Sequence, residues 1–296
     1  MRLDDYRTSD NVGDQRGQSF GGGGFGGGGG GLGLILGLVG SRFGIGGVAV
    51  VLIGAWLLGL FGGGGGQQAV SPQQQAGGKT AAQICSVDAA SRFSCQVLAS
   101  TEDTWGRIFQ QSGARYTPTT LIFYSGQGQS GCGAAQSAMG PFYCPTDKKV
   151  YLDTDFYREL SQRFGAAGDF AQAYVIAHEV GHHVQDLQGT LDQAHQQQAR
   201  AGEAEGNAIQ VRVELQADCY AGVWAAANKD RLEPGDVEEG MRAAHQIGDD
   251  VLQKAAQGRV VPETFTHGTA EQRMKWLRKG IETGDPAQCD TFSGAI

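Results

Sequence analysis

The chemically most informative stretch of this 296-residue chain is a pair of histidines with a glutamate directly after the first. His178, Glu179 and His182 form the pattern His-Glu-x-x-His. In an α-helix, residues four positions apart lie above one another on one face, so the two imidazoles could ligate the same metal ion. Glu179 would lie beside them and could hold a water molecule bound to that ion. The pattern therefore predicts a zinc site with a general base, against the plainer alternative of two histidines on a structural helix.

A catalytic zinc ion usually has three protein ligands, so the motif needs a further one. In one well-known class this ligand is a histidine, but Gln188 occupies its place here, and Gln185 occupies that of the glycine in the same pattern. A second pair, Glu214 and Asp218, is again four residues apart in an otherwise apolar stretch. Because burying an acid without a partner is costly, we expect Glu214 to be the third ligand and Asp218 to orient a ligand imidazole. A solvated acid pair is the alternative.

One further histidine is a candidate for the site. His267 lies in a loop that leads into a helix predicted over residues 269–283. A histidine in such a loop can reach a metal site and donate a hydrogen bond to an oxygen that becomes negatively charged during the reaction. An ordinary loop residue is the alternative.

The surrounding segments predict an α+β fold that is mostly helical. The motif lies in a predicted helix that begins at Gly168 and Asp169 and ends at Gly189, and other helices are predicted over 97–111, 191–228 and 234–257. Residues 120–124 read as a strand, and 140–144 with 149–153 read as a β-hairpin. Residues 150–153 are a candidate edge strand for an extended peptide substrate, or an ordinary hairpin edge. A small sheet followed by many helices is typical of α+β proteins.

The first part of the chain has a different composition from the rest. We expect residues 1–42 to be a disordered Gly-rich tail and residues 62–80 to be a flexible linker, ahead of a catalytic domain over 81–296. Residues 43–61 form a stretch of 19 residues without a charge. As a helix it would be about 28 Å long, close to the thickness of a membrane core. It is predicted to be a transmembrane helix, with a buried core helix or a cleaved signal peptide as alternatives.

The basic residues and the cysteines predict where the domain lies. Arg42 and Arg16 precede the predicted span, and no Lys or Arg follows it until Lys79, which places the N-terminus in the cytoplasm. The catalytic domain would then be periplasmic or otherwise extracytoplasmic, attached to the cell (inner) membrane by a single pass. An even number of cysteines agrees with disulfides in an oxidising compartment, although six buried thiols are the alternative. The disulfide candidates are Cys85, Cys95, Cys132, Cys144, Cys219 and Cys289.

Charge argues against one class of partner. The formal net charge is −8, and the chain carries 31 acidic and 23 basic residues. An acidic chain without a Lys/Arg cluster is a poor candidate for binding nucleic acid.

The motifs together resemble known zinc peptidases. His-Glu-x-x-His with Glu214 and Asp218 is similar to the gluzincin class, and Thr266-His267 followed by Arg273 resembles a Thr-His-Pro…Arg segment of the membrane peptidases related to the CaaX-processing protease. Gly268 stands in place of that proline. Over nearly the whole chain, the sequence more closely resembles a bacterial family called "putative neutral zinc metallopeptidase". The segments that carry this resemblance are Ser-Asp-Asn-Val at 9–12, Gly-Pro-Phe-Tyr-Cys-Pro at 140–145, Glu-Leu-Gln-Ala-Asp-Cys at 214–219, Gln-Gly-Arg-Val-Val-Pro at 257–262 and Asp-Pro-Ala-Gln-Cys at 285–289.

The resemblance implies a membrane-anchored peptidase fold and adds Arg273 to Asp218 as a residue that supports the site. We therefore predict a zinc-dependent endopeptidase that binds one catalytic Zn²⁺ and cleaves peptide or protein substrates. Its ligands would be His178, His182 and Glu214, with Glu179 as general base and His267 at the oxyanion. The alternatives are a zinc-binding scaffold or interaction protein that does not cleave, and a zinc hydrolase that acts on bonds other than peptide bonds.

Overall fold

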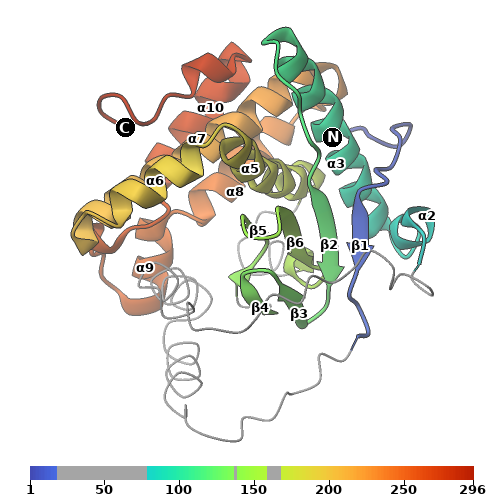
Figure 1. The fold of residues 1–296 in the computed structure, drawn as a ribbon, viewed down its shortest axis with the longest axis horizontal. Helices are drawn as coiled ribbons and strands as arrows, with labels where there is room; N and C mark the ends of the chain where they lie inside the picture. The colour runs from blue at the N-terminus through green and yellow to red at the C-terminus, as the bar shows by residue number, and fades with distance from the viewer. Residues whose placement is uncertain (19–78, 137–138, 159–167) are drawn as a thin grey trace, which may run out of the picture.

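We describe the fold from a computed structural model, which covers residues 1–18, 79–136, 139–158 and 168–296. The predicted α+β class is confirmed, with two small sheets beside a larger group of helices (Figure 1). The helices are α2 (Ala81–Cys85), α3 (Ala89–Gln111), α5 (Asp169–Leu187), α6 (Thr190–Gln198), α7 (Glu203–Ala227), α8 (Asp236–Gln246), α9 (Asp249–Gln257) and α10 (Ala270–Thr283), with short 3-10 turns at Lys229–Arg231, Pro262–Thr264 and Pro286–Gln288.

The main sheet has four strands in the order β1 (Val12–Asp14), β2 (Thr120–Tyr124), β6 (Lys149–Asp153) and β5 (Phe142–Cys144). The predicted hairpin is present, because β5 pairs antiparallel with β6. However, β6 also pairs in parallel with β2. The interpretation of residues 150–153 as an edge strand is therefore wrong. β5, the other strand of the hairpin, lies on one side of β6, and β2 lies on the other side. The edge strand nearest α5 is β5. A separate hairpin is formed by β3 (Gln127–Ser130) and β4 (Gly133–Gln136).

The long helices predicted in the second half exist, but two of them are divided. The segment 191–228 is split into α6 and α7, and 234–257 into α8 and α9. The second break lies at Gly248, where an added Cβ would overlap the backbone of Ala270 at the start of α10. The approach of a third helix, and not the local sequence alone, explains why the chain turns there.

The helix that carries the motif is packed between the sheet and the other helices. In Figure 1, α5 lies above β5 and β6, while α7 and α10 lie on its other side. The largest fully buried side chains in this region include Trp105, Trp224, Phe170 and Tyr174. Phe170, in the first turn of α5, stacks on Trp224 of α7. Aromatic packing of this kind contributes to holding α5 and α7 in one position.

The prediction that residues 1–42 are disordered is wrong for residues 1–18. These residues include β1, which pairs with β2 in parallel, and the buried side chains of Met1, Leu3 and Ser9. The N-terminal amine lies 2.6 Å from Asp169 and 3.0 Å from Asp236. The glycine repeats behind that prediction begin only after this segment. The partners of the segment lie between 65 and 235 residues further along the chain. Helix α2 begins at Ala81, the residue at which the domain is predicted to begin, and Thr80 is its N-cap.

The predicted transmembrane helix at 43–61 and most of the predicted linker lie outside the described residues. Within the ranges that the structure covers, we find no helix whose length and apolar character would suit a membrane span.

The prediction that the cysteines form disulfides is confirmed. All six are paired, as Cys85–Cys95, Cys132–Cys144 and Cys219–Cys289.

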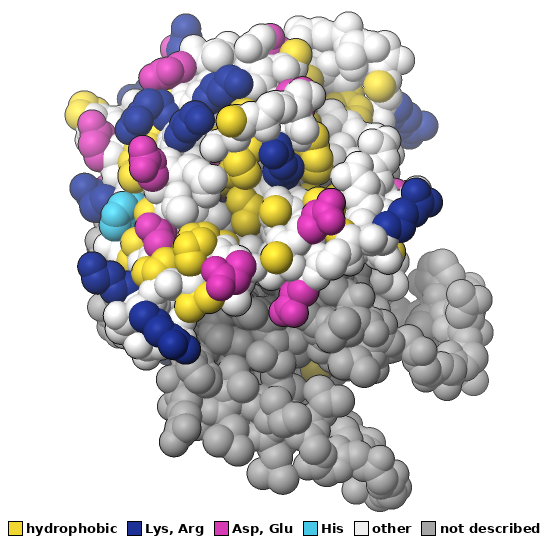
Figure 2. Space-filling view, turned by 90° about the vertical axis from the view of Figure 1, so that its left-hand side faces the viewer, with side chains coloured by type: hydrophobic (Ala, Val, Ile, Leu, Met, Phe, Trp, Pro, Cys, Tyr) yellow, Lys and Arg dark blue, Asp and Glu magenta, His cyan; other side chains and the backbone are white. Residues whose placement is uncertain are grey.

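On the described part of the face shown in Figure 2, acidic and basic side chains are interspersed.

Candidate metal centre

The candidate site forms where α5 and α7 cross. At this crossing Gly181 of α5 faces Ala217 of α7, and a Cβ at Gly181 would lie only 3.0 Å from the Ala217 carbonyl oxygen. The absence of a side chain therefore permits the two backbones to approach closely. His178 and His182 project from α5 and Glu214 from α7, so that one potential ligand atom of each lies within 4.8 Å of the others.

The geometry of these three side chains suits a small cation. Nε2 of His178 lies 3.2 Å from Oε2 of Glu214, and Nε2 of His182 lies 3.6 Å from the same oxygen. The two rings are nearly perpendicular, with 86° between their planes. His178 and Glu214 are each only 6% exposed. Two imidazole nitrogens and one carboxylate oxygen form a donor set that zinc accepts, so the residues present fit the metal that the sequence predicts.

Asp218 holds the first histidine in place. One of its carboxylate oxygens, Oδ1, lies 2.9 Å from Nδ1 of His178, and the same oxygen accepts a 2.6 Å hydrogen bond from the Tyr174 hydroxyl. The Arg273 guanidinium donates to both oxygens, from Nε at 2.8 Å and from Nη2 at 2.9 Å. With Nδ1 directed at Asp218, Nε2 of His178 is the nitrogen that faces Glu214.

The second histidine, His182, has a partner that was not among the predicted site residues. Oε1 of Gln185 lies 2.9 Å from Nδ1 of His182, while its Nε2 donates to the Val213 carbonyl at 2.8 Å and to Gln216 at 2.9 Å. Gln185 therefore orients a ligand on α5 and is bonded to α7 directly before Glu214. Its position three residues after His182 was a local signal, because such residues share a helix face. Gln210, one turn before Glu214, donates to Oε1 of that carboxylate at 3.0 Å.

Glu179 lies beside these residues, buried and next to the edge strand. Burial raises the pKa of its carboxyl, and the charges of the two histidines and the backbone N–H of Tyr143 in β5 oppose this shift. Only 7% of Glu179 is exposed. A carboxylate whose pKa is raised accepts a proton more readily, which is what a general base requires.

Strand β5 is held against α5 by side chains around Tyr143. Its hydroxyl donates to Asp186 at 2.7 Å and lies 3.1 Å from Nδ1 of His183. Nε2 of His183 lies 2.7 Å from the carbonyl oxygen of Thr117. These bonds fix the strand whose backbone contacts Glu179.

His267 lies in the loop before α10, and this loop packs against α7, the helix that carries Glu214. Gly268 packs against α7, where an added Cβ would be 3.1 Å from Val211 and 3.4 Å from Leu215. Gly268 has a φ of +87°, a left-handed conformation that proline cannot adopt, which explains why the chain departs here from the pattern it resembles. His267 is near enough for its positive charge to contribute to lowering the pKa of Glu214.

Asp249 is the partner of His267 and was not among the predicted site residues. Its Oδ2 accepts backbone N–H groups from Thr266, His267 and Gly268, at 2.8, 2.6 and 3.1 Å. Its Oδ1 lies 3.2 Å from Nδ1 of the His267 ring. Burial alone would lower the pKa of His267, but the Asp249 carboxylate outweighs burial and raises it. The sequence offers no local signal for a contact between residues 18 positions apart across a helix.

The two buried carboxylates of the site, Glu214 and Asp218, are stabilised in their charged forms by neighbouring side chains. Burial raises the pKa of the Glu214 carboxyl, but the His182 and His178 rings outweigh it and hold that pKa well below its usual range. For Asp218, burial is likewise outweighed by Arg273 and His178, so that its pKa is lowered to about 2. Both carboxylates are therefore negatively charged at neutral pH, as a ligand and its supporting residue must be.

Comparison with known proteins agrees with this geometry. The model of a family described as "Putative neutral zinc metallopeptidase" matches residues 1–292. The chain is 48% identical to the "Uncharacterized protein YpfJ" of Escherichia coli K12, with all of both chains covered. It is 46% identical to the "Uncharacterized protein Rv2575" of Mycobacterium tuberculosis, over 70% of this chain and 73% of that one. No solved structure gives a significant match.

Proposed function

Because the chain belongs to the family described as "Putative neutral zinc metallopeptidase", we propose that it is a zinc-dependent endopeptidase. The observation that carries the proposal is the convergence of His178, His182 and Glu214 beside the buried carboxyl of Glu179. A scaffold protein would need the ligands but has no use for a buried acid next to them. The proposed cofactor is one Zn²⁺ ion, and the proposed substrate is a peptide or protein.

Each residue of the site has a distinct task in this proposal. When bound, zinc would supply Lewis-acid chemistry, which polarises the scissile carbonyl and lowers the pKa of a water molecule. Glu179 accepts a proton from the attacking water and then delivers it to the leaving amine nitrogen. His267 donates an N–H to the carbonyl oxygen as negative charge develops there. Asp249 keeps that ring oriented by its bond to Nδ1, so Nε2 is the nitrogen that serves the substrate.

The compartment of the domain is part of the proposal. Three disulfides support an oxidising, extracytoplasmic location, because such bonds are rare in the bacterial cytoplasm. Membrane attachment through residues 43–61 stays a prediction from the sequence.

The function is tested by cleavage of a peptide library with purified protein, before and after removal of metal by a chelator. We expect cleavage that the chelator abolishes and added zinc restores. Glu179→Gln should keep its zinc, because no ligand is changed, and should lose about 10²–10⁴-fold in rate because the base is gone. Glu214→Ala should lose zinc and activity together, because a ligand is removed.

The outcomes separate the proposal from its alternatives. Wild-type cleavage rates in a zinc-loaded Glu179→Gln protein would contradict the assigned base. Tight zinc binding by Glu214→Ala would contradict the ligand set. Stoichiometric zinc without cleavage of any peptide would favour a binding protein or a hydrolase of other bonds.

A further inference from the structure

We propose that residues 1–18 and the domain beginning at residue 79 lie on the same side of any membrane that the protein contacts. The chain between them then does not make a single crossing, contrary to the topology that the distribution of basic residues predicts. Contacts between the two described parts carry this inference.

The first set of contacts is a strand pairing. β1 pairs in parallel with β2, and Val12, Gly13 and Asp14 stand opposite Leu121, Ile122 and Phe123. The pairing continues at both ends, because the Leu121 N–H donates to the Asn11 carbonyl at 2.9 Å and the Gln15 N–H donates to the Phe123 carbonyl at 2.7 Å. Figure 1 shows β1 directly beside β2. Without β1, a row of backbone groups on β2 would lose its partners.

The second set surrounds a buried acid of α3. Glu102 is only 8% exposed, and the hydrogen-bond donors found around its carboxylate come from the N-terminal segment. Ser9 donates to Oε1 at 2.5 Å, Asn11 donates to the same oxygen at 2.8 Å, and Arg7 donates to Oε2 at 3.0 Å. Loss of the partners of a buried carboxylate strongly lowers the free energy of unfolding, because an unpaired charge is left in the interior. The domain and the N-terminal segment therefore fold as one unit.

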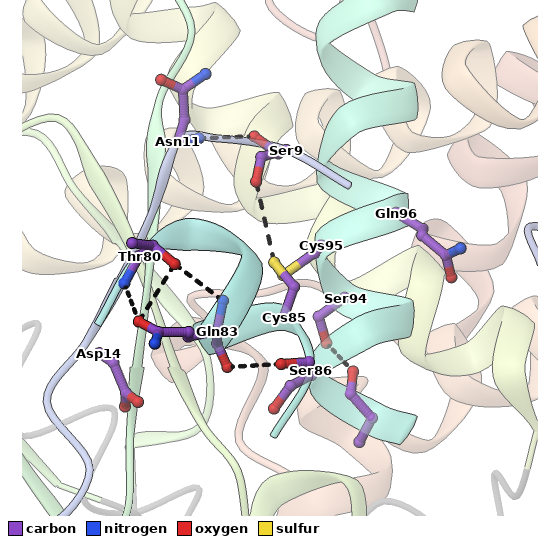
Figure 3. Close-up of a disulfide and its surroundings, with 12 residues drawn as sticks. Ser9, Asn11, Asp14, Thr80, Gln83, Cys85, Ser86, Ser94, Cys95 and Gln96 are labelled. Carbon is purple, nitrogen blue, oxygen red and sulfur yellow. Dashed lines mark hydrogen bonds between the residues drawn. A yellow bond between two sulfur atoms is a disulfide. The ribbon is translucent and has the colours of Figure 1, made fainter. Parts of the chain in front are cut away.

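The third contact lies at a disulfide. The Ser9 N–H donates to the Cys95 carbonyl at 3.1 Å, and the Ser9 carbonyl oxygen lies 3.9 Å from Sγ of Cys85. Figure 3 shows Ser9 beside the Cys85–Cys95 bond, with the Asn11 N–H donating to the Ser9 hydroxyl. The N-terminal segment thus contacts the Cys85–Cys95 disulfide, and a disulfide of this kind indicates that this part of the domain lies in an oxidising compartment.

These contacts limit how the chain can meet a membrane. One crossing, or any odd number, between residues 18 and 79 would put the two parts in different compartments, whether they pair within one chain or between two copies. Two helical crossings would need about 40 apolar residues. The apolar stretch at 32–61 has only 30 residues, interrupted by Ser41 and Arg42. Residues 1–18 and the domain beginning at residue 79 therefore stay in one compartment.

Single-cysteine labelling of the full chain tests the inference. The six native cysteines are held in disulfides, so an introduced thiol reports on its own position. Asp10→Cys places it in the N-terminal segment and Glu238→Cys places it in α8, and both positions are exposed. We expect a membrane-impermeant maleimide added to intact spheroplasts to label both variants at rates within a few-fold of each other.

The matched pair also distinguishes the possible failures. Labelling of Glu238→Cys together with protection of Asp10→Cys until the membrane is lysed would overturn the inference. Protection of both until lysis would still support a common side, but would contradict the oxidising compartment of the proposed function. Peptidase activity does not enter either readout, so this test stands apart from the assignment of the active site.

Discussion

At the scale of residues, the three proposed zinc ligands and His267 are each held by a partner outside the motif. His178 is held by Asp218, His182 by Gln185, and Glu214 by Gln210. His267 is held by Asp249. Groups oriented in advance need little reorganisation during a reaction, which is a large part of what such sites contribute to catalysis.

The pair of His267 and Asp249 gives a prediction with a pH dependence. His267→Ala should retain zinc and lower kcat by about 10²–10³-fold, because a hydrogen bond to the developing charge is lost. Asp249 raises the pKa of His267, so the protonated ring persists to higher pH in the wild type than it would alone. Activity that needs this proton falls as the pH rises through the raised pKa. In Asp249→Asn, that alkaline fall should move to lower pH.

The measurement is kcat as a function of pH for zinc-loaded proteins. His245→Ala removes an exposed histidine of α8 and serves as the control, with an unchanged profile expected. An alkaline limb that stays in place in Asp249→Asn would contradict the assigned role of His267.

Asp218 gives a prediction for the stability of the metal-free protein in acid. Burial opposes the shift, but Arg273 and His178 lower the pKa of Asp218 from 3.8 to about 2. Because this pKa is lower in the folded protein than in the unfolded chain, the charged Asp218 carboxylate stabilises the fold. This contribution to the free energy of unfolding is complete above about pH 4 and is lost as the pH falls towards 2. Its size is about 2 kcal/mol, at about 1.4 kcal/mol for each unit.

Between pH 4 and pH 2, the free energy of unfolding of the wild type should therefore fall by about 2 kcal/mol more than that of Asp218→Asn. Urea unfolding of the chelator-treated proteins measures this difference. Asp218→Asn should already be less stable at neutral pH, by about 3–5 kcal/mol, because Arg273 loses its charged partner. Glu238→Gln, which removes one exposed charge, should follow the wild-type curve. Parallel curves for the wild type and Asp218→Asn would contradict the prediction.

At the scale of elements, the crossing of α7 and α10 brings Arg273 to Asp218. The helices touch through glycines, since a Cβ at Gly280 would overlap the Cys219 carbonyl oxygen and lie 2.8 Å from the Cα of Gly222. Backbone atoms cannot rotate away as side chains can, so the helices would have to separate. Such a separation would also displace the guanidinium that holds Asp218.

Gly280→Ala should therefore lower the free energy of unfolding by about 3 kcal/mol, despite the better helix propensity of alanine. It should also weaken zinc binding. Gly106 of α3 is the matched control, because nothing lies within 4 Å of an added Cβ there. Gly106→Ala should stabilise the protein by about 0.5–1 kcal/mol in the same denaturant titration. Equal effects at the two glycines would show that the crossing is looser than described.

At the scale of the whole molecule, a disulfide joins the metal-site helix to the C-terminal segment. Cys219 follows Asp218 directly on α7 and is bonded to Cys289, 70 residues further along the chain. Gln216 of the same helix donates to the Cys289 carbonyl at 3.0 Å. Closing so long a loop restricts the unfolded chain considerably.

Replacement of both Cys219 and Cys289 by alanine should lower the free energy of unfolding by about 4 kcal/mol, from loop entropy. Zinc affinity of the protein that remains folded should change little, because Asp218 is still bonded to Arg273. Removal of the Cys132–Cys144 pair, which encloses a shorter loop, should cost about 3 kcal/mol. Denaturant unfolding without reductant and zinc titration provide the two measurements. A large loss of zinc affinity in the folded variant would show that the disulfide itself positions Asp218.

The sequence by itself determined what depends on neighbouring positions. Spacing of four along a helix brought His178 and His182 to one face, and the same spacing predicted Glu214 and Asp218 as a pair. Residues 120–124 were predicted as a strand with the bounds that the structure shows, because an uninterrupted run of β-forming residues is a local property. Pairing of the cysteines could be expected from their even number and the compartment, although the partner of Cys219 could not be derived from spacing.

Only the tertiary structure decided which distant groups meet. Asp249 reaches the His267 loop, β2 covers one side of β6, and the first 18 residues complete the sheet and satisfy Glu102. None of these contacts can be read from a sequence pattern. Each joins residues of different elements, and only the course of the chain through the fold brings those elements together. The glycine repeats favour disorder, and the prediction was extended to the short segment before them. Residues 1–18 are ordered because they are buried against residues about a hundred positions away.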